Sequence, residues 1–207
     1  MIKAGSIAAL GSALTLVPAP ASAAHIPPPG SVAVEIATLN DSGCPRGTVS
    51  VDSDTELFRF RYSNYSAFVG QGQPPPAFRK NCQISVKVRH PPEYTYGIMS
   101  VEHSGFADIQ EGASGTLKST FALSSRKTPA STEHVIPGRY SQNWHFTEQS
   151  DLPEVIVRPC GETSFTTLAT ELRVDAGTSD TTKVSFMSLD STDTTLNSTY
   201  RFYWLHC

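Results

Sequence analysis

Five of the six histidines in the chain, all except His25, could act as bases or metal ligands in the body of the protein, but their spacing matches no known catalytic or metal-binding motif. They are His90, His103, His134, His145 and His206. The chain contains no HExxH or HxH pair and no GxSxG motif, so neither a zinc hydrolase nor an α/β-hydrolase is indicated. Serines are too numerous for one to be selected as a nucleophile. We interpret each histidine as an ordinary surface or partly buried residue.

Paired carboxylates are the groups that hydrolyse glycosidic bonds, and their separation in space decides the mechanism. Glu102, Asp108, Glu111 and Glu171 are candidates for this role, and spacing alone does not select among them. The catalytic residues of an enzyme therefore stay unassigned at this stage.

Four aspartates in a Ser/Thr-rich region could supply oxygen ligands to Ca²⁺. Their spacing matches no calcium-binding loop, and we interpret residues 175–199 as a solvated hairpin with Thr-rich strand faces. No metal site is predicted from them. These residues are Asp175, Asp180, Asp190 and Asp193.

His25 offers one specific route to redox chemistry. If export processing left His25 as the N-terminal residue, its amine and ring nitrogen could bind copper together with a second histidine. The segment that follows, Ile26-Pro27-Pro28-Pro29, instead resembles an extended tether. We expect no cofactor and keep the copper site as an alternative.

Aromatic residues near the C-terminus could form a surface on which sugar rings stack. Trp144 is one candidate, and the terminal strand carries Tyr200, Phe202 and Trp204 on one face with Tyr203 on the other. Burial in the core is the commoner role of such residues.

Basic residues alternate along two predicted strands, as Arg59 with Arg61 and Lys87 with Arg89. Such rows could bind an acidic polysaccharide, although ordinary solvated strand faces show the same pattern. The formal net charge is −3 and basic residues form no cluster in the sequence. We therefore expect no nucleic-acid partner.

The first residues have the layout of a secretory signal. Lys3 precedes an apolar run from Ile7 to Val17, and Ala21-Ser22-Ala23 is a small-residue cleavage site. The run is shorter than the ~20 residues that span a bilayer. We predict a signal peptide over 1–23, a proline-rich lead-in over 24–30, and a single soluble, monomeric domain over 31–207 that is secreted.

Four cysteines all lie after the predicted signal, and no CxxC spacing indicates a metal site. An even number in an exported chain predicts two disulfides. Cys44 with Cys82 would join two neighbouring turn and strand segments, and Cys160 with Cys207 would hold the terminal strand. We favour this pairing over the two other connectivities.

Three sequons could carry glycans if the host is a eukaryote. They begin at Asn40, Asn64 and Asn197.

Alternating apolar and polar residues predict an antiparallel, all-β fold. About ten short strands separated by Gly/Pro turns favour a β-sandwich of the jelly-roll or immunoglobulin-like type, with no helix in the mature chain. The predicted strands are 32–36, 58–62, 82–88, 94–103, 115–123, 140–146, 154–158, 165–174, 183–189 and 199–206.

Several segments resemble the secreted fungal and actinobacterial proteins grouped as Domain of Unknown Function 4360. The resemblance rests on the order GCP (43–45), RKNC (79–82), PCG (159–161) and a terminal FYWLHC (202–207), and it covers about residues 31–207. It implies export and a shared cysteine framework, but it supplies no reaction.

These observations favour a secreted, disulfide-bonded, non-enzymatic protein that binds at a cell wall, glycan or host surface. One alternative is an extracellular polysaccharide-active enzyme, including the copper-dependent variant. Another is an effector or inhibitor that binds a partner protein through loops such as 70–78 or 124–138. An exposed row of aromatic residues would favour glycan binding, and two carboxylates facing each other in a cleft would favour an enzyme. An exposed apolar patch on the loops would favour a protein partner.

Overall fold

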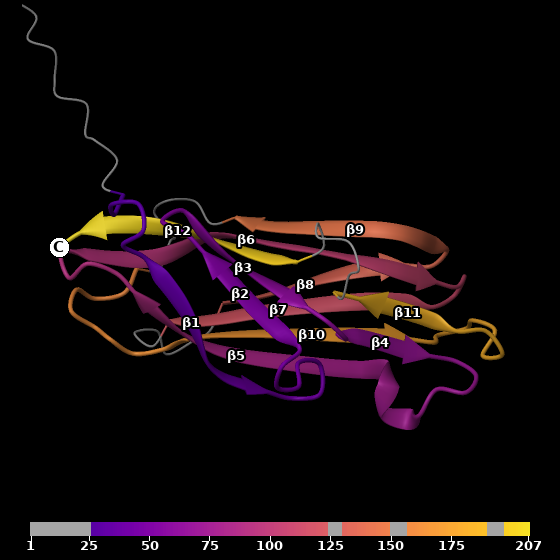
Figure 1. The fold of residues 1–207 in the computed structure, drawn as a ribbon. Helices are drawn as coiled ribbons and strands as arrows, with labels where there is room; N and C mark the ends of the chain where they lie inside the picture. Colours follow the sequence, from indigo (N-terminus) through magenta and orange to yellow (C-terminus); the bar gives the residue numbers. More distant parts are fainter. Residues whose placement is uncertain (1–25, 124–129, 150–156, 190–196) are drawn as a thin grey trace, which may run out of the picture.

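The chain folds into two antiparallel β-sheets packed face to face (Figure 1). The computed structural model describes residues 26–123, 130–149, 157–189 and 197–207, and the statements below concern these ranges. They contain twelve strands, one short 3-10 helix and no α-helix. The predicted β-sandwich is therefore confirmed.

Sheet A has five strands and sheet B has seven. Sheet A runs in the order β1 (Ala33–Asn40), β5 (Arg79–Arg89), β10 (Thr166–Asp175), β7 (Ser114–Leu123) and β8 (Ala130–Pro137). Sheet B runs in the order β2 (Val49–Ser53), β3 (Leu57–Tyr62), β12 (Ser198–His206), β6 (Tyr94–Ile109), β11 (Ser185–Ser188) and β4 (Ser66–Val69), and β9 (Tyr140–Gln149) also pairs with β6.

Strict alternation along the strands decides which side chains enter the core. On β5, Cys82, Ile84 and Val86 are buried between more exposed neighbours, and β10 repeats the pattern with Leu168 and Leu172. Because successive side chains of a strand point to opposite faces, these residues meet the inner face of sheet B. The sequence pattern predicts this inner face directly.

Aromatic rings from β3 and β12 fill one part of the core. Phe58 and Tyr200 stack with ring centroids 5.0 Å apart, and Phe202 packs against Phe58 at 5.1 Å. Each fully buried side chain of this size stabilises the fold by about 1.5–3 kcal/mol relative to exposure. The terminal strand is therefore an integral part of the sandwich.

Buried polar groups connect the two sheets at three places. The Tyr65 hydroxyl donates to the Thr170 carbonyl at 2.8 Å, and the Tyr96 hydroxyl is hydrogen-bonded to Thr166 Oγ1 at 2.8 Å. The third link joins His103 Nε2 to Ser119 Oγ at 3.1 Å. A buried polar group without a partner costs stability, so these links define how the sheets align.

Two disulfides join segments that are distant in sequence. Cys44 is bonded to Cys82 with the Cα atoms 5.2 Å apart, and Cys160 is bonded to Cys207 with the Cα atoms 5.9 Å apart. This is the pairing that the sequence favours. The first bond lies within the core, and the second ties the C-terminus to the loop before β10.

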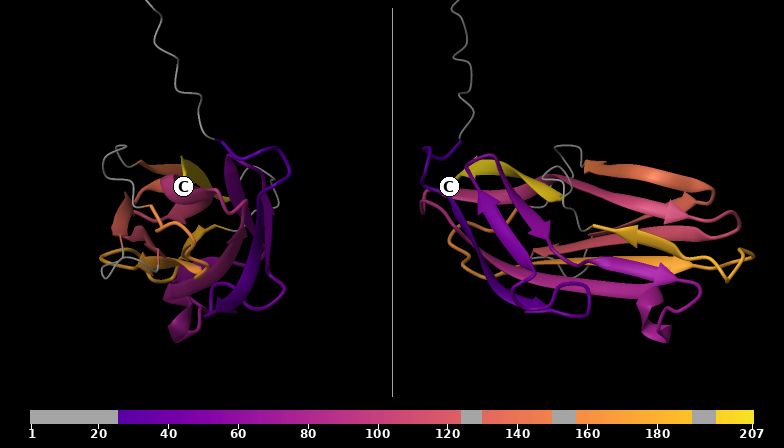
Figure 2. Two further views of the ribbon diagram at one scale, coloured as in Figure 1. Left: turned by 90° about the vertical axis from the view of Figure 1, so that its left-hand side faces the viewer. Right: turned by 45° about the vertical axis from the view of Figure 1, so that its right-hand side comes forward.

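The two ends of the sandwich differ in what they carry. The residues that precede β1 and the C-terminus lie at one end, while η1 (Pro75–Phe78) and the turns after β4, β6 and β10 lie at the other (Figure 2). The C-terminal end holds the Cys160–Cys207 bond. The η1 end is open enough to form a groove.

Candidate functional site

A groove of about 360 Å³ lies at the η1 end of the sandwich. It is formed by the end of β4 with the loop that follows, by η1, and by the end of β10 with the turn after it. Ligand sites typically occupy clefts of roughly this size. Its lining residues are Phe68, Val69, Gly70, Gln73, Pro74, Pro75, Phe78, Arg173, Val174, Asp175 and Ala176.

The proline-rich loop forms one wall of the groove because of its local sequence. Pro74 is extended and precedes the 3-10 turn of η1, in which Ala77 N donates to the Pro74 carbonyl at 2.9 Å. Proline suits the first turn of a helix because its φ is already correct there and its missing N–H is not needed. The resulting turn exposes Phe78.

Gly70 allows the loop to leave β4 close to the segment before β11. Its φ is +119°, a conformation that other residues rarely adopt, and a Cβ at this position would clash with the carbonyl oxygen of Lys183. The groove therefore depends on glycine at this position.

The groove combines apolar rings with a single ion pair. Phe78 is 43% exposed, and Phe68 is half-buried at the edge of sheet B. Arg173 Nη2 donates to Asp175 Oδ2 at 2.8 Å. The Gly177 backbone N–H and the Arg173 guanidinium hold the pKa of Asp175 below its ordinary value. The two charged residues in the lining cancel each other, so the groove carries aromatic faces and polar groups without net charge.

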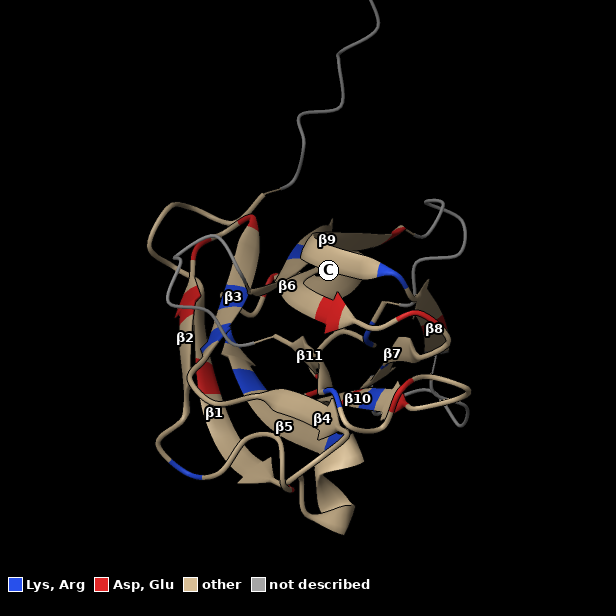
Figure 3. Cartoon of the chain, turned by 90° about the vertical axis from the view of Figure 1, so that its right-hand side faces the viewer, with Lys and Arg blue, Asp and Glu red and all other residues tan. Residues whose placement is uncertain are grey.

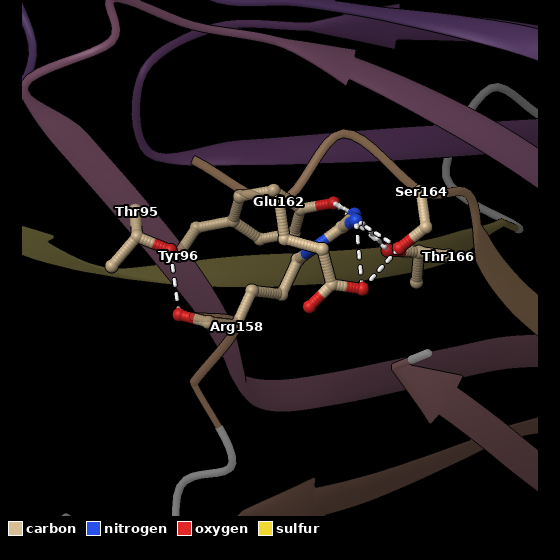
Figure 4. A network of polar contacts seen from close by, with 6 residues as sticks. All are labelled: Thr95, Tyr96, Arg158, Glu162, Ser164 and Thr166. Atoms are coloured by element: carbon tan, nitrogen blue, oxygen red, sulfur yellow. Dashed lines mark hydrogen bonds and ion pairs between the residues drawn. The ribbon is translucent and has the colours of Figure 1, made fainter. Parts of the chain in front are cut away.

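A second polar network lies at the opposite end and is closed. Figure 4 shows Arg158 beneath the loop that leads into β10. Its guanidinium donates to Tyr96 Oη at 2.8 Å and to Ser164 Oγ at 2.6 Å, and it lies 3.7 Å from Glu162 Oε1. The Arg158 carbonyl accepts from Thr95 Oγ1 at 2.8 Å.

Burial shows that the Arg158 network holds the fold together. The Arg158 side chain is 3% exposed, and its guanidinium carbon lies 5.3 Å from the centre of the Tyr96 ring. A cation this deep is tolerated when hydrogen bonds and a carboxylate compensate its lost hydration. The network anchors the 157–166 segment next to the Cys160–Cys207 bond.

His103 is buried completely and serves as a polar link within the core. Both ring nitrogens are hydrogen-bonded, Nδ1 to Ser198 Oγ at 2.8 Å and Nε2 to Ser119 Oγ at 3.1 Å. Burial, with smaller contributions from the nearby His134 and His145, lowers the pKa of His103 to about 3. Although serines contact this histidine, they are buried as well, so no substrate reaches them.

The other histidines are spread over several faces. His134 stacks on Phe146 with centroids 4.4 Å apart, and His145 on the outer face of β9 is hydrogen-bonded to Ser104 Oγ at 2.7 Å. His90 and His206 contact the rings of Trp204 and Tyr94 respectively. In the described part of the chain, no three histidine, cysteine or carboxylate side chains gather as metal ligands.

The aromatic residues singled out in the sequence belong to the core. Trp144, Tyr200, Phe202 and Trp204 are all buried, and only Tyr203 lies on the outer face of β12. They therefore form no sugar-stacking surface, and the alternation predicted for the terminal strand is confirmed.

The four candidate catalytic carboxylates lie in three separate places. Glu102 lies within 3.4 Å of Arg201 on sheet B, and Glu171 is 2.6 Å from Arg79 on sheet A. Asp108 and Glu111 line another hollow of about 450 Å³ near the turn after β6, together with Asp180. Lys183 and Arg139 share that hollow, and Arg139 pairs with Glu111 at 2.5 Å.

Each of the predicted basic rows has an acidic neighbour on the adjacent strand. Arg59 and Arg61 lie 3.5 and 2.8 Å from Asp52, and Arg89 lies 2.9 Å from Glu35. Figure 3 shows basic and acidic segments side by side on β2 and β3. These strand faces are ordinary solvated surfaces.

Some sequence-based candidates lie outside the described residues. They are the predicted signal peptide, His25, Asp190, Asp193 and the loop 124–129. Of the sequon asparagines, Asn40 and Asn64 are exposed, whereas Asn197 is half-buried and accepts a hydrogen bond from Thr199 Oγ1 at 2.8 Å. Their glycosylation stays a prediction.

The sequence-based interpretation did not bring together the residues that build the groove. Phe68, Phe78 and Arg173 lie on three elements, and only the strand containing Arg173 was predicted. The sequence singled out the loop 70–78 and Asp175 separately, as a partner-binding loop and a calcium ligand, and the proline run at 74–76 indicated that the loop is stiff and exposed.

Comparison with known proteins identifies the family. A family model described as "Domain of unknown function (DUF4360)" matches residues 30–207. The chain belongs to the DUF4360 family. The family resemblance drawn from the cysteine-containing segments is thereby confirmed.

A relative of this DUF4360 protein is described as an uncharacterized secreted protein of Arthroderma benhamiae. The two are 26% identical over 185 residues, which cover 88% of this chain and 75% of the relative. Together with the two disulfides, this relationship supports the predicted secretion, and the protein is a secreted one. None of the described helical segments is long and apolar enough to cross a bilayer.

Proposed function

We propose that this DUF4360 protein is a secreted, non-enzymatic binding protein that recognises a polysaccharide through the groove at the η1 end. The observation that carries the proposal is the composition of the groove. It presents the rings of Phe68 and Phe78 beside Gln73 and the Arg173–Asp175 pair.

Sugars need both kinds of group. The faces of a sugar ring are rich in C–H groups and pack on aromatic rings, while the hydroxyls around the edge need donors and acceptors. The guanidinium of Arg173, the carboxylate of Asp175 and the amide of Gln73 supply these. Because the ion pair is internally balanced, an uncharged sugar fits better than an acidic one.

A protein partner is the weaker alternative. Large exposed apolar patches mark most protein-binding surfaces. Among the described residues, the large exposed apolar side chains come from five separate segments, and the groove contains one of them, Phe78. Six of its eleven lining residues are polar, proline or glycine, which suits a polar ligand.

An enzyme acting on glycosidic bonds would need two carboxylates facing each other across the bound sugar. Asp175 is the carboxylate in the groove, and it is paired with Arg173. The geometry therefore supports binding over hydrolysis at this site.

Phe78 provides the direct test, because the chain offers a matched control. Phe78 is 43% exposed inside the groove, and Phe165 is 51% exposed on the loop before β10 and does not line the groove. The probes are insoluble β-1,3-glucan, chitin and cellulose in pull-down assays with the mature protein. We expect Phe78→Ala to weaken binding to the retained polysaccharide at least tenfold, about 1.4 kcal/mol.

The control variant Phe165→Ala should bind like the wild-type protein. If no polysaccharide retains the wild-type protein, or if both variants bind equally well, the proposal is wrong. Catalysis is tested in the same samples, since release of soluble sugar would indicate an enzyme.

A further inference from the structure

Three phenylalanines continue from the groove across the outer face of sheet B. They are Phe68 on β4, Phe186 on β11 and Phe106 on β6. Their chain neighbours Ala67, Met187 and Ala107 are fully buried. Since neighbouring side chains alternate between faces, the three rings lie on the outer side, away from the core.

The rings form a continuous row, which we call the phenylalanine row. Phe68 and Phe186 are directly opposite in the strand register, with centroids 5.6 Å apart and an interplanar angle of 27°. Phe186 and Phe106 are diagonal neighbours, with centroids 5.8 Å apart and an angle of 33°. Phe68 belongs to the row and to the groove, so the two surfaces are contiguous.

Stabilisation of the sheet explains only part of this arrangement. A cross-strand aromatic pair stabilises a sheet by roughly 0.2–1 kcal/mol, and one such pair would be enough for that purpose. The solvent face of an antiparallel sheet is normally polar. Here three half-buried phenylalanines instead form an apolar strip that starts at the groove on β4 and continues across β11 to β6.

Polar side chains border the far end of the phenylalanine row. Asn143 on β9 lies opposite Phe106 and is exposed, and the hydrogen-bonded pair Ser104 and His145 lies one step along the same face. Asp108, opposite Phe186, adds one carboxylate acceptor. Apolar rings with hydroxyl, amide and imidazole groups alongside match a hydroxyl-rich chain better than a lipid or a second protein surface.

We propose that the groove and the phenylalanine row form one extended site for an uncharged polysaccharide chain, which lies across β4, β11 and β6. The inference rests on the proposed function and makes it more specific. The row adds two ring-to-ring steps of 5.6 and 5.8 Å beyond the groove, so the site takes several consecutive sugar units. Short oligosaccharides occupy the groove alone.

Chain length is the variable that tests this site. Calorimetry with the mature protein uses laminari-oligosaccharides and chito-oligosaccharides of two and of six units. For the series that binds, we expect the hexamer to bind at least tenfold more tightly than the dimer. Phe106→Ala should remove most of that advantage and leave dimer affinity unchanged, because Phe106 lies outside the groove.

Two further variants keep the result interpretable. Phe106→Leu retains apolar bulk, so it should fold even if Phe106→Ala is destabilised, and it should still lose part of the hexamer advantage. Phe165→Ala is the exposed control and should change neither affinity. Equal binding of dimer and hexamer, or an unchanged hexamer affinity in both Phe106 variants, overturns the extended site alone. Failure of every oligosaccharide and polysaccharide to bind overturns the proposed function with it.

Discussion

Two arginine–carboxylate pairs lie at opposite ends of the sandwich, and they differ in almost everything except their chemistry. Arg158 is 3% exposed and lies 3.7 Å from Glu162, whereas Arg173 is 50% exposed and lies 2.8 Å from Asp175. The buried pair is the longer one, but three further oxygens surround its guanidinium. The exposed pair is short, and solvent reaches both of its partners.

The difference in burial gives the two ion pairs different roles, because one stabilises the fold and the other is accessible to a ligand. A buried charge depends on its partners, and removing the partners or the charge disturbs the surrounding fold. An exposed ion pair contributes little stability because water and salt screen it. The Arg158 network therefore stabilises the C-terminal end of the sandwich. Arg173 and Asp175, in contrast, can give up their ion pair to bind a ligand.

The largest expected effect belongs to Arg158. Arg158→Ala removes the hydrogen bonds to Tyr96 and Ser164 and leaves a cavity beside the Tyr96 ring. We expect a loss of about 3 kcal/mol in the free energy of unfolding, measured by urea denaturation at pH 7. Polysaccharide binding at low temperature should be unchanged. A loss below 1 kcal/mol would mean that the network is not a structural anchor.

Protonation of His103 should produce a loss of stability of intermediate size at low pH. Its folded pKa is about 3, below the 6.5 of an ordinary histidine. Protonation therefore favours the unfolded chain, and the stability that neutral His103 contributes is present above pH 6.5 and is lost as the pH falls toward 3. At pH 4.5 this loss amounts to about 2–3 kcal/mol.

Urea denaturation at pH 7 and pH 4.5 tests the His103 prediction against a matched variant. His103→Gln removes the titrating group, so its stability should fall less between the two pH values than that of the wild-type protein. His145→Gln, at an exposed position on β9, should keep most of the wild-type pH dependence, because His145 is the smallest of the three contributions to the pKa of His103. The prediction fails if His103→Gln shows the same dependence as the wild-type protein.

Period-two alternation was sufficient to predict the core of this fold. Tyr200, Phe202 and Trp204 were assigned to one face of the last strand, and they lie in the core as alternation requires. The strands missing from the prediction are β2, β4 and β8. β2 and β4 are short, and β8 exposes Val135, so their apolar pattern is weak.

The groove could not be predicted because it depends on tertiary contacts. Phe68 and Phe78 approach the end of β10 only once the loop 70–78 has connected β4 of sheet B to β5 of sheet A, and Arg173 comes from sheet A. The spacing of these residues in the sequence does not indicate that they lie close together in the fold. The disulfides were easier to predict, because each pairs a cysteine in a turn or loop, Cys44 or Cys160, with a cysteine near a strand end or at the chain end, Cys82 or Cys207.

Replacing Arg173 should produce the smallest change in the free energy of unfolding and a clear change in polysaccharide binding. The control is Arg89, which is 60% exposed and pairs with Glu35 at 2.9 Å on the same sheet, but lies outside the groove. Arg173→Ala and Arg89→Ala should each change the free energy of unfolding by less than about 1 kcal/mol, because exposed pairs are screened. Only Arg173→Ala should weaken binding to the retained polysaccharide, by about tenfold, since a hydrogen bond from a charged donor is worth about 1.5–3 kcal/mol. The measurement is affinity electrophoresis beside urea denaturation. Equal binding by the two variants would show that the ion pair in the groove is as ordinary as the one on β1 and β5.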